Sequence, residues 1–228
     1  MESIRASDES ETRRAPLTRA RVLQAAVDLA DREGIDAVSM RRLGQELGIE
    51  AMSLYTHVRG KEDLLDGMVD TVVAEIAVDP TGPDWRTTLR RTILGARTVM
   101  LRHRWAARVI ETRTTPGLAT LAYMEAATGV VRDGGFTIDL THHAMHVLGS
   151  RVFGFNQDLY DDPGVPDPAA AASFAAQLAG AYPNVAAIAA AASHEDGLGG
   201  CDDDYEFAFG LDLILDGLEQ RRAATPSS

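Results

Sequence analysis

The chain lacks several features that would place it in other classes of protein. Its 228 residues include one cysteine, Cys201, which excludes an internal disulfide framework and is typical of proteins in a reducing cytoplasm. No apolar run approaches the roughly 20 residues that span a bilayer, and residues 1–16 have no apolar core of a secretion signal. We expect a cytoplasmic protein with no membrane partner.

Strand patterns and the motifs of catalytic sites are also missing. No segment shows a convincing strand-like alternation of apolar and polar residues, so we expect an all-α fold. The chain has no GxSxG elbow, no Walker phosphate loop and no dinucleotide fingerprint. We predict no enzymatic activity and no cofactor.

Three histidines lie close together at His142, His143 and His146, where positions four apart share a helix face. No HExxH glutamate accompanies them, and Cys201 has no second cysteine to complete a metal site. We favour polar interface histidines over a metal site and predict no bound metal.

The net charge of -12 is distributed unevenly. Between residues 13 and 61 there are nine basic and six acidic side chains, whereas the rest of the chain carries the acidic excess. DNA phosphates would be repelled by the acidic part and attracted to residues 13–61, where Arg13, Arg14, Arg19 and Arg21 form a basic patch. So small a module makes few phosphate contacts, and we expect two copies of it to bind two half-sites together.

Residues 39–65, SMRRLGQELGIEAMSLYTHVRGKEDLL, read as two short helices joined by a glycine turn and followed by the start of a third helix. Ser39 is a side-chain N-cap for the first helix, and Gly48 can take the left-handed conformation that ends it. The second helix, over residues 51–57, turns Leu54 toward the core, with Val58 beyond it. This helix-turn-helix pattern predicts binding in the major groove of duplex DNA.

The outward side chains of this motif and its basic residues are the candidate DNA contacts. They are Arg41, Arg42, Ala51, Met52, Ser53, Tyr55, His57 and Lys61. Arg41 can reach a guanine edge or a phosphate. Lys61, the only lysine of the chain, begins a long helix where backbone N–H groups and a cation together favour a phosphate. The alternatives are solvated arginines, a partly buried tyrosine and a neutral histidine between helices.

The segment LYTHVRGKEDLL resembles the DNA-binding domain of the tetracycline-repressor (TetR) family. The match is carried by Leu54, Tyr55, His57, Val58, Lys61, Leu64 and Leu65. Residues 18–34 are similar to the family's first helix, and FAFGLDLILDGLEQ at 207–220 and GGF at 134–136 are similar to the tetracycline-repressor branch of its ligand domain. The resemblance implies a three-helix DNA-binding domain followed by a larger helical domain for ligand binding and dimerisation.

By this resemblance Arg41 occupies the family's base-contacting arginine position, and Ala51, Met52 and Ser53 occupy base-reading positions. The family's glutamine, proline and threonine are replaced there, so we expect a different operator sequence. Ser53 can donate or accept a hydrogen bond, whereas Ala51 and Met52 offer apolar contact. For Tyr55 we prefer a phosphate contact.

A chain of this length can hold a small domain and a larger one. We divide it into a disordered tail at 1–16, a helix-turn-helix domain at 17–62, a ligand-binding and dimerisation domain at 63–222 and a tail at 223–228. Apolar periodicity and turn residues predict helices over 62–78, 85–103, 105–111, 116–133, 137–160 and 205–222, and the resemblance implies one over 18–34. Asp84 and Thr137 are predicted N-caps, and Thr115 with Pro116 is predicted to open the helix that ends near Asp133.

The resemblance also implies a small-molecule pocket whose occupation moves the linking helix, residues 62–78, and takes the recognition helices out of register with DNA. The expected pocket residues are Ala77, Thr92, Ala96, Met100, Trp105, Ile110, Arg113, Met124, Ala127 and Val131. Most of the polar chemistry of the family's tetracycline site is absent. We therefore expect a more apolar or differently polar ligand, not tetracycline, with a packed core as the alternative for part of the set.

A second copy of the chain is the expected partner of two helices, over residues 137–160 and 205–222. In the family these helices pair with their copies in a four-helix bundle. The expected interface residues are Val147, Gly149, Val152, Phe153, Phe207, Leu211, Leu215 and Leu218. Glycines permit close helix approach and the apolar residues fill the contact, while a monomer core is the alternative.

These predictions combine into a dimeric regulator of transcription that binds a palindromic operator and is released by a small molecule. The sequence does not identify the molecule or the sign of regulation. The alternative is an α-helical binding protein or enzyme with a vestigial helix-turn-helix, and a third possibility is an activator or nucleoid-type protein that no metabolite releases.

Overall fold

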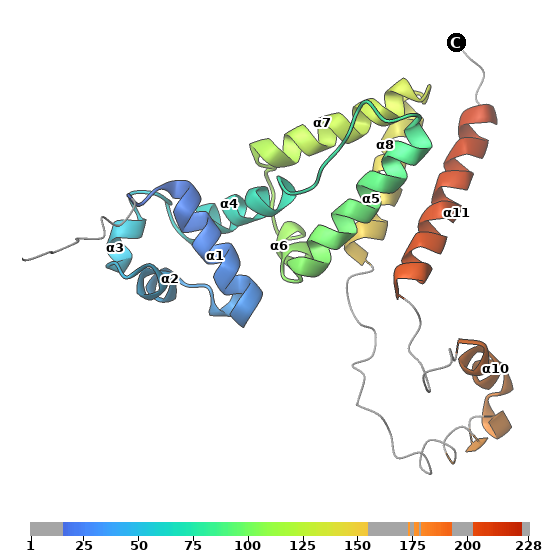
Figure 1. Ribbon diagram of the computed structural model, residues 1–228, viewed down its shortest axis with the longest axis horizontal. Coiled ribbons are helices and arrows are strands. Elements are labelled where there is room, and N and C mark those ends of the chain that lie inside the picture. Colours follow the sequence, from blue (N-terminus) through green and yellow to red (C-terminus); the bar gives the residue numbers. More distant parts are fainter. Residues whose placement is uncertain (1–15, 155–172, 174–175, 178, 193–202, 225–228) are drawn as a thin grey trace, which may run out of the picture.

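The computed structural model describes residues 16–154, 173, 176–177, 179–192 and 203–224, and this part of the chain is helical with no strand. The predicted all-α fold is confirmed. Nearly all of the two predicted tails, residues 155–160 of one predicted helix, and Cys201 lie outside the described residues. Figure 1 shows an elongated molecule in which a small N-terminal group of helices is joined by helix α4 to a larger helical body. Within the described residues, no helix is long and apolar enough to cross a membrane.

The N-terminal group consists of α1 (Arg19–Glu33), a short 3-10 turn η1 (Ile35–Ala37), α2 (Met40–Leu47) and α3 (Ala51–Leu54). Ser39 caps α2 as predicted, since its hydroxyl accepts a hydrogen bond from the Arg42 N–H at 3.2 Å. Gly48 ends the helix at φ 67°, in the left-handed region that favours glycine. A Cβ at Gly44 would lie 3.0 Å from the Ile49 carbonyl oxygen, so this glycine lets α3 approach α2 closely.

Two of the predicted helices are shorter than expected. The recognition helix was predicted over 51–57 but ends at Leu54, after which Thr56 and His57 bond back three residues in a tighter turn. This turn leads into Val58, which is 1% exposed in the core. The linking helix α4 (Lys61–Val73) ends five residues before its predicted limit, because Glu75 and Ile76 also make three-residue bonds.

Helix α4 packs closely against α1 at Gly67, where a larger residue would require the Leu23 side chain to move. A Cβ at Gly67 would lie 2.5 Å from a methyl carbon of Leu23. Beside this crossing Arg19 donates to the Asp63 carboxylate at 2.8 and 2.9 Å and to the carbonyl of His57 at 2.9 Å. The Arg19 guanidinium lowers the pKa of the Asp63 carboxyl, so the pair stays ionised at neutral pH. The start of α4 is therefore fixed to α1 and to the turn after α3.

The larger body contains α5 (Trp85–Arg102), α6 (Ala106–Ile110), α7 (Leu118–Asp133), α8 (Ile138–Gly154) and α11 (Asp203–Ala224), whereas α10 (Pro183–Ala192) lies apart from it in Figure 1. Asp84 caps α5 as predicted, accepting from the Thr87 N–H at 2.8 Å, and α5 contacts α7, α8 and α11. The predicted opening of α7 by Thr115 and Pro116 is wrong. The helix begins at Leu118 after Gly117, and its cap comes from another helix.

The apolar stripe of α11 is buried within this chain, which corrects our assignment of Phe207, Leu211, Leu215 and Leu218 to a dimer interface. All four are buried, three of them at 0% exposure, in the core shared with α5 and α8. The ring of Phe207 lies between the guanidinium groups of Arg97 and Arg151, 4.8 and 4.7 Å from its centroid. For these residues the monomer core, our alternative, holds.

Ion pairs fix α11 along α5. Asp216 pairs with Arg86 at 2.7 Å, Asp212 with Arg90 at 2.8 Å, and Asp204 with Arg97. Their spacing along both helices keeps the two axes side by side, as Figure 1 shows. Only the opposite face of α11 is left for another molecule.

We expect Leu211→Ala to lower the free energy of unfolding by about 2–5 kcal/mol, because it opens a cavity in a fully buried position. Gln220→Ala, on the exposed side of the same helix, is the control and should change stability by less than about 0.5 kcal/mol. Urea unfolding followed by circular dichroism measures both. Equal stability of the two variants would show that this stripe is not core.

Candidate functional site

The recognition helix α3 presents a polar and apolar outer face at one end of the molecule. Met52 is 75% exposed and Tyr55 47%, Ser53 is also exposed, and Ala51 is half-buried. Leu54 has no exposed surface and anchors the helix on the core. The three predicted base-reading positions, and Tyr55 just after them, are thus on the side that another molecule can reach.

The basic residues around α3 differ in how far they are already engaged. Arg41 and Lys61 are exposed, and no side-chain partner is recorded for either among the described residues. Arg42, in contrast, pairs with Glu33 at 2.5 Å and with Glu46 at 3.4 Å. His57 is half-buried, and its carbonyl accepts from Arg19. Arg41 and Lys61, together with the exposed Arg59, are therefore the cations of this end that are most open to a phosphate.

A cavity of about 870 Å³ lies in the larger body, between α5, α7 and α8, and reaches the end of α4. Its lining is mainly apolar and includes Met100, Met124, Met145 and Phe153. Val73, the last residue of α4, and Ile76 just beyond it form part of the same wall. The cavity thus touches the helix that leads to the DNA-binding domain.

Four of the ten predicted pocket residues line this cavity: Ala96, Met100, Ile110 and Met124. The other six lie elsewhere. Thr92, Ala127 and Val131 are buried in the helix packing, and Ala77 is exposed in the connection after α4. Trp105 and Arg113 have polar partners on α1 and α4.

Three residues that we assigned to the dimer interface line the cavity instead: Gly149, Val152 and Phe153. Sequence reasoning missed most of the polar wall, which is made by Thr120, Tyr123, Thr128, Arg132, Thr141, His142, His146 and Ser150. Its signal was present, because Thr120, Met124, Thr128 and Arg132 follow one another at four-residue spacing on α7, as do His142 and His146 on α8. Burial raises the pKa of the Tyr123 phenol, which therefore stays protonated at neutral pH.

The Asp70 carboxylate of α4 caps the N-terminus of α7. Asp70 accepts from the backbone N–H of Ala119 at 3.1 Å and of Thr120 at 2.9 Å, and the Thr120 hydroxyl also donates to it at 3.2 Å. Free N–H groups at a helix N-terminus need such acceptors, and the helix dipole favours a negative charge there. A Cβ at Gly117 would lie 2.4 Å from the Asp70 carboxylate, so glycine makes room for this contact.

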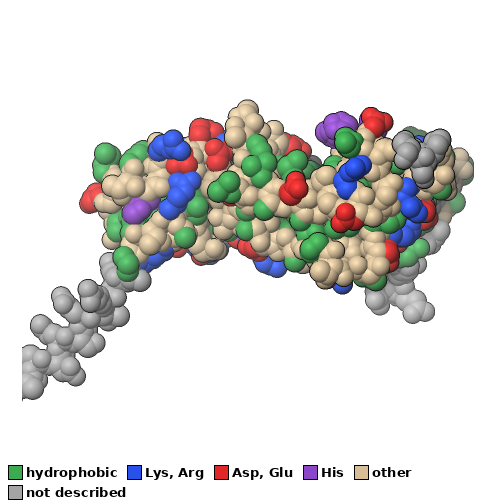
Figure 2. Space-filling model, turned by 90° about the horizontal axis from the view of Figure 1, so that it is seen from above, with side chains coloured by type: hydrophobic (Ala, Val, Ile, Leu, Met, Phe, Trp, Pro, Cys, Tyr) green, Lys and Arg blue, Asp and Glu red, His purple; other side chains and the backbone are tan. Residues whose placement is uncertain are grey.

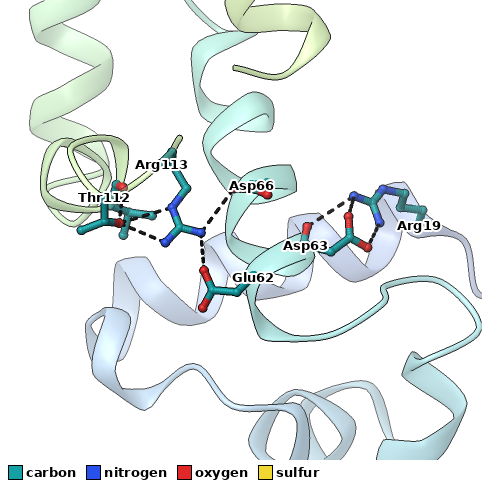
Figure 3. Close-up of polar contacts among 7 residues, drawn as sticks. Arg19, Glu62, Asp63, Asp66, Thr112 and Arg113 are labelled. Carbon is teal, nitrogen blue, oxygen red and sulfur yellow. Dashed lines mark hydrogen bonds and ion pairs between the residues drawn. The ribbon is translucent and has the colours of Figure 1, made fainter. Parts of the chain in front are cut away.

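A second set of polar contacts to α4 lies one helical turn from Asp70. Figure 3 shows Arg113 reaching from the loop before α7 to α4, where it donates to Glu62 at 2.7 Å and to Asp66 at 3.3 Å. The Glu62 and Asp66 carboxylates raise the pKa of Arg113, whose guanidinium also donates to the Thr112 hydroxyl at 3.1 Å. The N-terminal half of α4 is therefore held to the same loop that precedes the cavity wall.

A third set of polar contacts connects α1 with the end of α5. The His103 ring, almost fully buried, places Nδ1 2.9 Å from both carboxylate oxygens of Asp31, and the Trp105 indole N–H donates to Asp31 at 2.7 Å. On its other side Nε2 of His103 lies 3.3 Å from Glu75, which also accepts from Arg102 at 2.5 Å. Asp31 belongs to the DNA-binding domain and His103 to the larger one.

The described residues contain no group of three or more histidines, cysteines or carboxylates arranged to hold a metal. The rings of His142 and His146 do lie together, with centroids 4.6 Å apart, and those of His142 and His143 are 5.5 Å apart. Figure 2 shows histidine side chains gathered near one end of the visible face, beside basic and acidic groups.

The chain is similar to known regulators over nearly its whole length. The family model for bacterial regulatory proteins of the tetR family matches residues 22–68, and the model for the tetracyclin repressor-like C-terminal domain matches residues 79–222. The HTH-type transcriptional repressor DrrR1 of Streptomyces coeruleorubidus is 34% identical over 219 residues, which cover 89% of this chain and 77% of that protein.

Solved structures give the same result. Apo ActR from Streptomyces coelicolor superposes with a TM-score of 0.75 at 30% identity, covering 92% of this chain and 98% of that one. The tetracycline repressor protein class D of Escherichia coli is 29% identical over 163 residues, covering 67% of this chain and 74% of its own length. A helix-turn-helix, a cavity at the end of the linking helix and these similarities lead to one conclusion: the chain belongs to the TetR family of transcriptional regulators.

Proposed function

We propose that this protein is a homodimeric repressor in the cytoplasm that leaves a palindromic operator when a small molecule fills the cavity described above. The observation that carries the proposal is the position of Val73 and Ile76, which line the cavity at the end of the helix whose first residue is Lys61. A bound molecule therefore touches the element that orients α3. The similar ActR from Streptomyces coelicolor has been solved in complex with actinorhodin, which supports a small molecule as the signal.

On the operator, the exposed face of α3 enters the major groove. Ser53 hydrogen-bonds to a base edge, and Met52 and Ala51 make apolar contact, for example with a thymine methyl group. Arg41 reaches a guanine or a phosphate, and Lys61 and Tyr55 bind the backbone. Arg42 and His57 contribute less, since Arg42 is neutralised by two carboxylates and His57 is half-buried.

Electrophoretic shifts with the DNA that flanks the protein's own gene test this assignment. Lys61→Ala should weaken binding to all sequences and reduce the salt slope by about one unit for each protomer on the operator, whereas Arg41→Ala should cost roughly 1–3 kcal/mol for each base contact and relax specificity. Arg108→Ala, at an exposed arginine of α6, is the control. Wild-type affinity in the Lys61, Arg41 double variant would contradict the assignment. Indifference of the wild type to all genomic DNA would support a vestigial helix-turn-helix.

The dimer forms through the outer face of α11 with the adjacent part of α8. Tyr205, Phe209 and Leu213 are exposed at 63, 52 and 57% and follow one another at four-residue spacing, and Val147 on α8 is 38% exposed. An apolar stripe of this kind on a helix whose other face is already buried needs a partner. This set replaces the inner stripe that we first assigned, and Val147 is common to both.

Phe209→Glu combined with Leu213→Glu should give a folded monomer, because association would then bury unpaired carboxylates. Tyr182→Glu, which changes a 62% exposed tyrosine outside this stripe, should remain dimeric. Sedimentation equilibrium gives the mass of each variant, and circular dichroism checks its helix content. A dimer in the double variant would place the interface elsewhere.

Three sets of polar contacts connect the larger body to α4 and α1, so that a molecule in the cavity changes the position of α4. Asp70 ties α4 to the first turn of α7, Arg113 ties it to the preceding loop, and Asp31 ties α1 to His103. Thr120 bonds to Asp70 and also lines the cavity, so a molecule that displaces Thr120 alters the hydrogen bonds of α4 directly. Such a molecule acts only through a difference in its affinity for the operator-bound and free forms.

Asp70→Ala should weaken this transmission. A thermal-shift screen of the purified dimer, beginning with actinorhodin, identifies a ligand. The ratio of its Kd with and without saturating operator is the coupling, typically about 5- to 150-fold, and Asp70→Ala should reduce that ratio with little change in the Kd without DNA.

Gly117→Ala is an independent variant, because its methyl group must move the Asp70 carboxylate. It should reproduce the effect of Asp70→Ala, and the double variant should add little to either. Glu125→Ala, an exposed carboxylate of α7, is the control. Unchanged coupling in both Asp70→Ala and Gly117→Ala would exclude this route.

A further inference from the structure

The side chains of the described cavity lining that carry or can gain a charge by protonation are those of an arginine and two histidines. Arg132 from α7 and His142 and His146 from α8 are in the wall, and no aspartate or glutamate is among the described lining residues. The chain as a whole has 34 acidic and 22 basic residues. A positively charged wall in an acidic protein is complementary in charge to an anion.

These groups are positioned together. The rings of His142 and His146 are one helical turn apart with centroids 4.6 Å from each other, and both keep contact with solvent at the rim. Arg132 is fixed by a hydrogen bond from Nη1 to the Phe136 carbonyl oxygen at 2.5 Å, which leaves its other nitrogens as donors. An oxyanion at this rim would meet charged donors from two helices.

Two hydroxyls of the wall already donate their protons, Thr141 to the Thr137 carbonyl at 2.7 Å and Ser150 to the Val147 carbonyl at 2.9 Å, so they take no part in holding the anion. The Tyr123 phenol, kept protonated by burial, is a further donor. The deeper wall, formed by Met100, Ile110 and their neighbours, is apolar and suits a flat hydrophobic body.

We propose that the cavity selects aromatic acids, with the anionic group held by Arg132, His142 and His146 and the ring system against the methionines. The inference rests on the proposed function of the cavity as the effector site. An anion here favours the charged form of His142 and His146, so its binding tightens as the pH falls.

Other titratable groups do not reverse this dependence. On α8 itself His143 faces Asp139 at 3.8 Å and is outside the lining. From α7 the cavity receives Arg132 and Tyr123, and from α5 it receives Ala96 and Met100, which have no charge. Arg97 of α5 and Arg151 of α8 lie against the Phe207 ring of α11, Arg86 and Arg90 pair with Asp216 and Asp212 of α11, and none of the four lines the cavity.

The test uses two fluorescent probes with the same aromatic skeleton. 1-Anilinonaphthalene-8-sulfonate carries a sulfonate, and N-phenyl-1-naphthylamine is its neutral counterpart. At about pH 6 the wild-type dimer should bind the sulfonate at least about tenfold more tightly than the neutral probe, since charge-assisted hydrogen bonds exceed neutral ones by this order. The preference should shrink at about pH 8. EDTA is present throughout, so a metal bridge between the histidines cannot produce it.

Variants assign the preference to the named residues. His142→Gln with His146→Gln should remove its pH dependence and most of its size, without changing the affinity for the neutral probe. His143→Gln, on the same helix but outside the wall, should behave as wild type. Thr128→Trp, which fills the cavity, should displace both probes and shows where they bind.

Equal affinity for the two probes, a preference that survives in the double histidine variant, or probe binding that Thr128→Trp does not reduce would each overturn the proposal. So would the absence of binding by either probe. None of these results bears on operator binding, and release of the operator by a neutral ligand would leave the proposed repressor intact while refuting selection for acids.

Discussion

The carboxylate of Asp70 is the constraint on which the rest of the structure depends, because it makes one helix the cap of another. Its acceptors satisfy the first N–H groups of α7, 49 and 50 residues further along the chain. An N-cap of this kind contributes about 1 kcal/mol to a helix, a large share of what holds a first turn in place. The wall of the cavity is therefore built on α4, and movement of either helix costs the other its hydrogen bonds.

At the DNA-binding end, several basic side chains are already paired with carboxylates of the same chain. Three basic groups there hold the domain together: Arg19 binds Asp63, Arg32 binds Glu46 at 2.7 Å, and Arg42 binds Glu33 and Glu46. A net charge of -12 further limits attraction to phosphate. With few cations left for the backbone of DNA, the proposed dimer would gain affinity by doubling its contacts and by the orientation of α3. Small changes in the angle of α4 then have large consequences for binding.

Local features were predictable from the sequence, and contacts between distant segments were not. Ser39, Gly48 and Asp84 act within four residues of their partners, and the motif at 39–65 has a spacing that propensity alone specifies. The cap of α7 was misassigned because nothing local marks Asp70. The periodicity of α11 identified a buried face correctly but could not say whether this chain or a second copy buries it. Which residues line the cavity depends on how α7 crosses α8. For this reason only four of the ten residues that we predicted to line it do so.

The shape of the cavity explains why a ligand can act at a distance without a specialised relay. A molecule that fills about 870 Å³ between α5, α7 and α8 also meets Val73 and Ile76, where α4 ends in a tightened turn. That turn is not part of a regular helix, whereas α5, α7 and α8 are packed on several sides, and a close-packed interior transmits displacement. The hydrogen bonds at Asp70 and the ion pairs of Arg113 fix the remainder of α4 to the same walls. Ligand and operator therefore compete for the position of one helix, and each must weaken the binding of the other by the same factor.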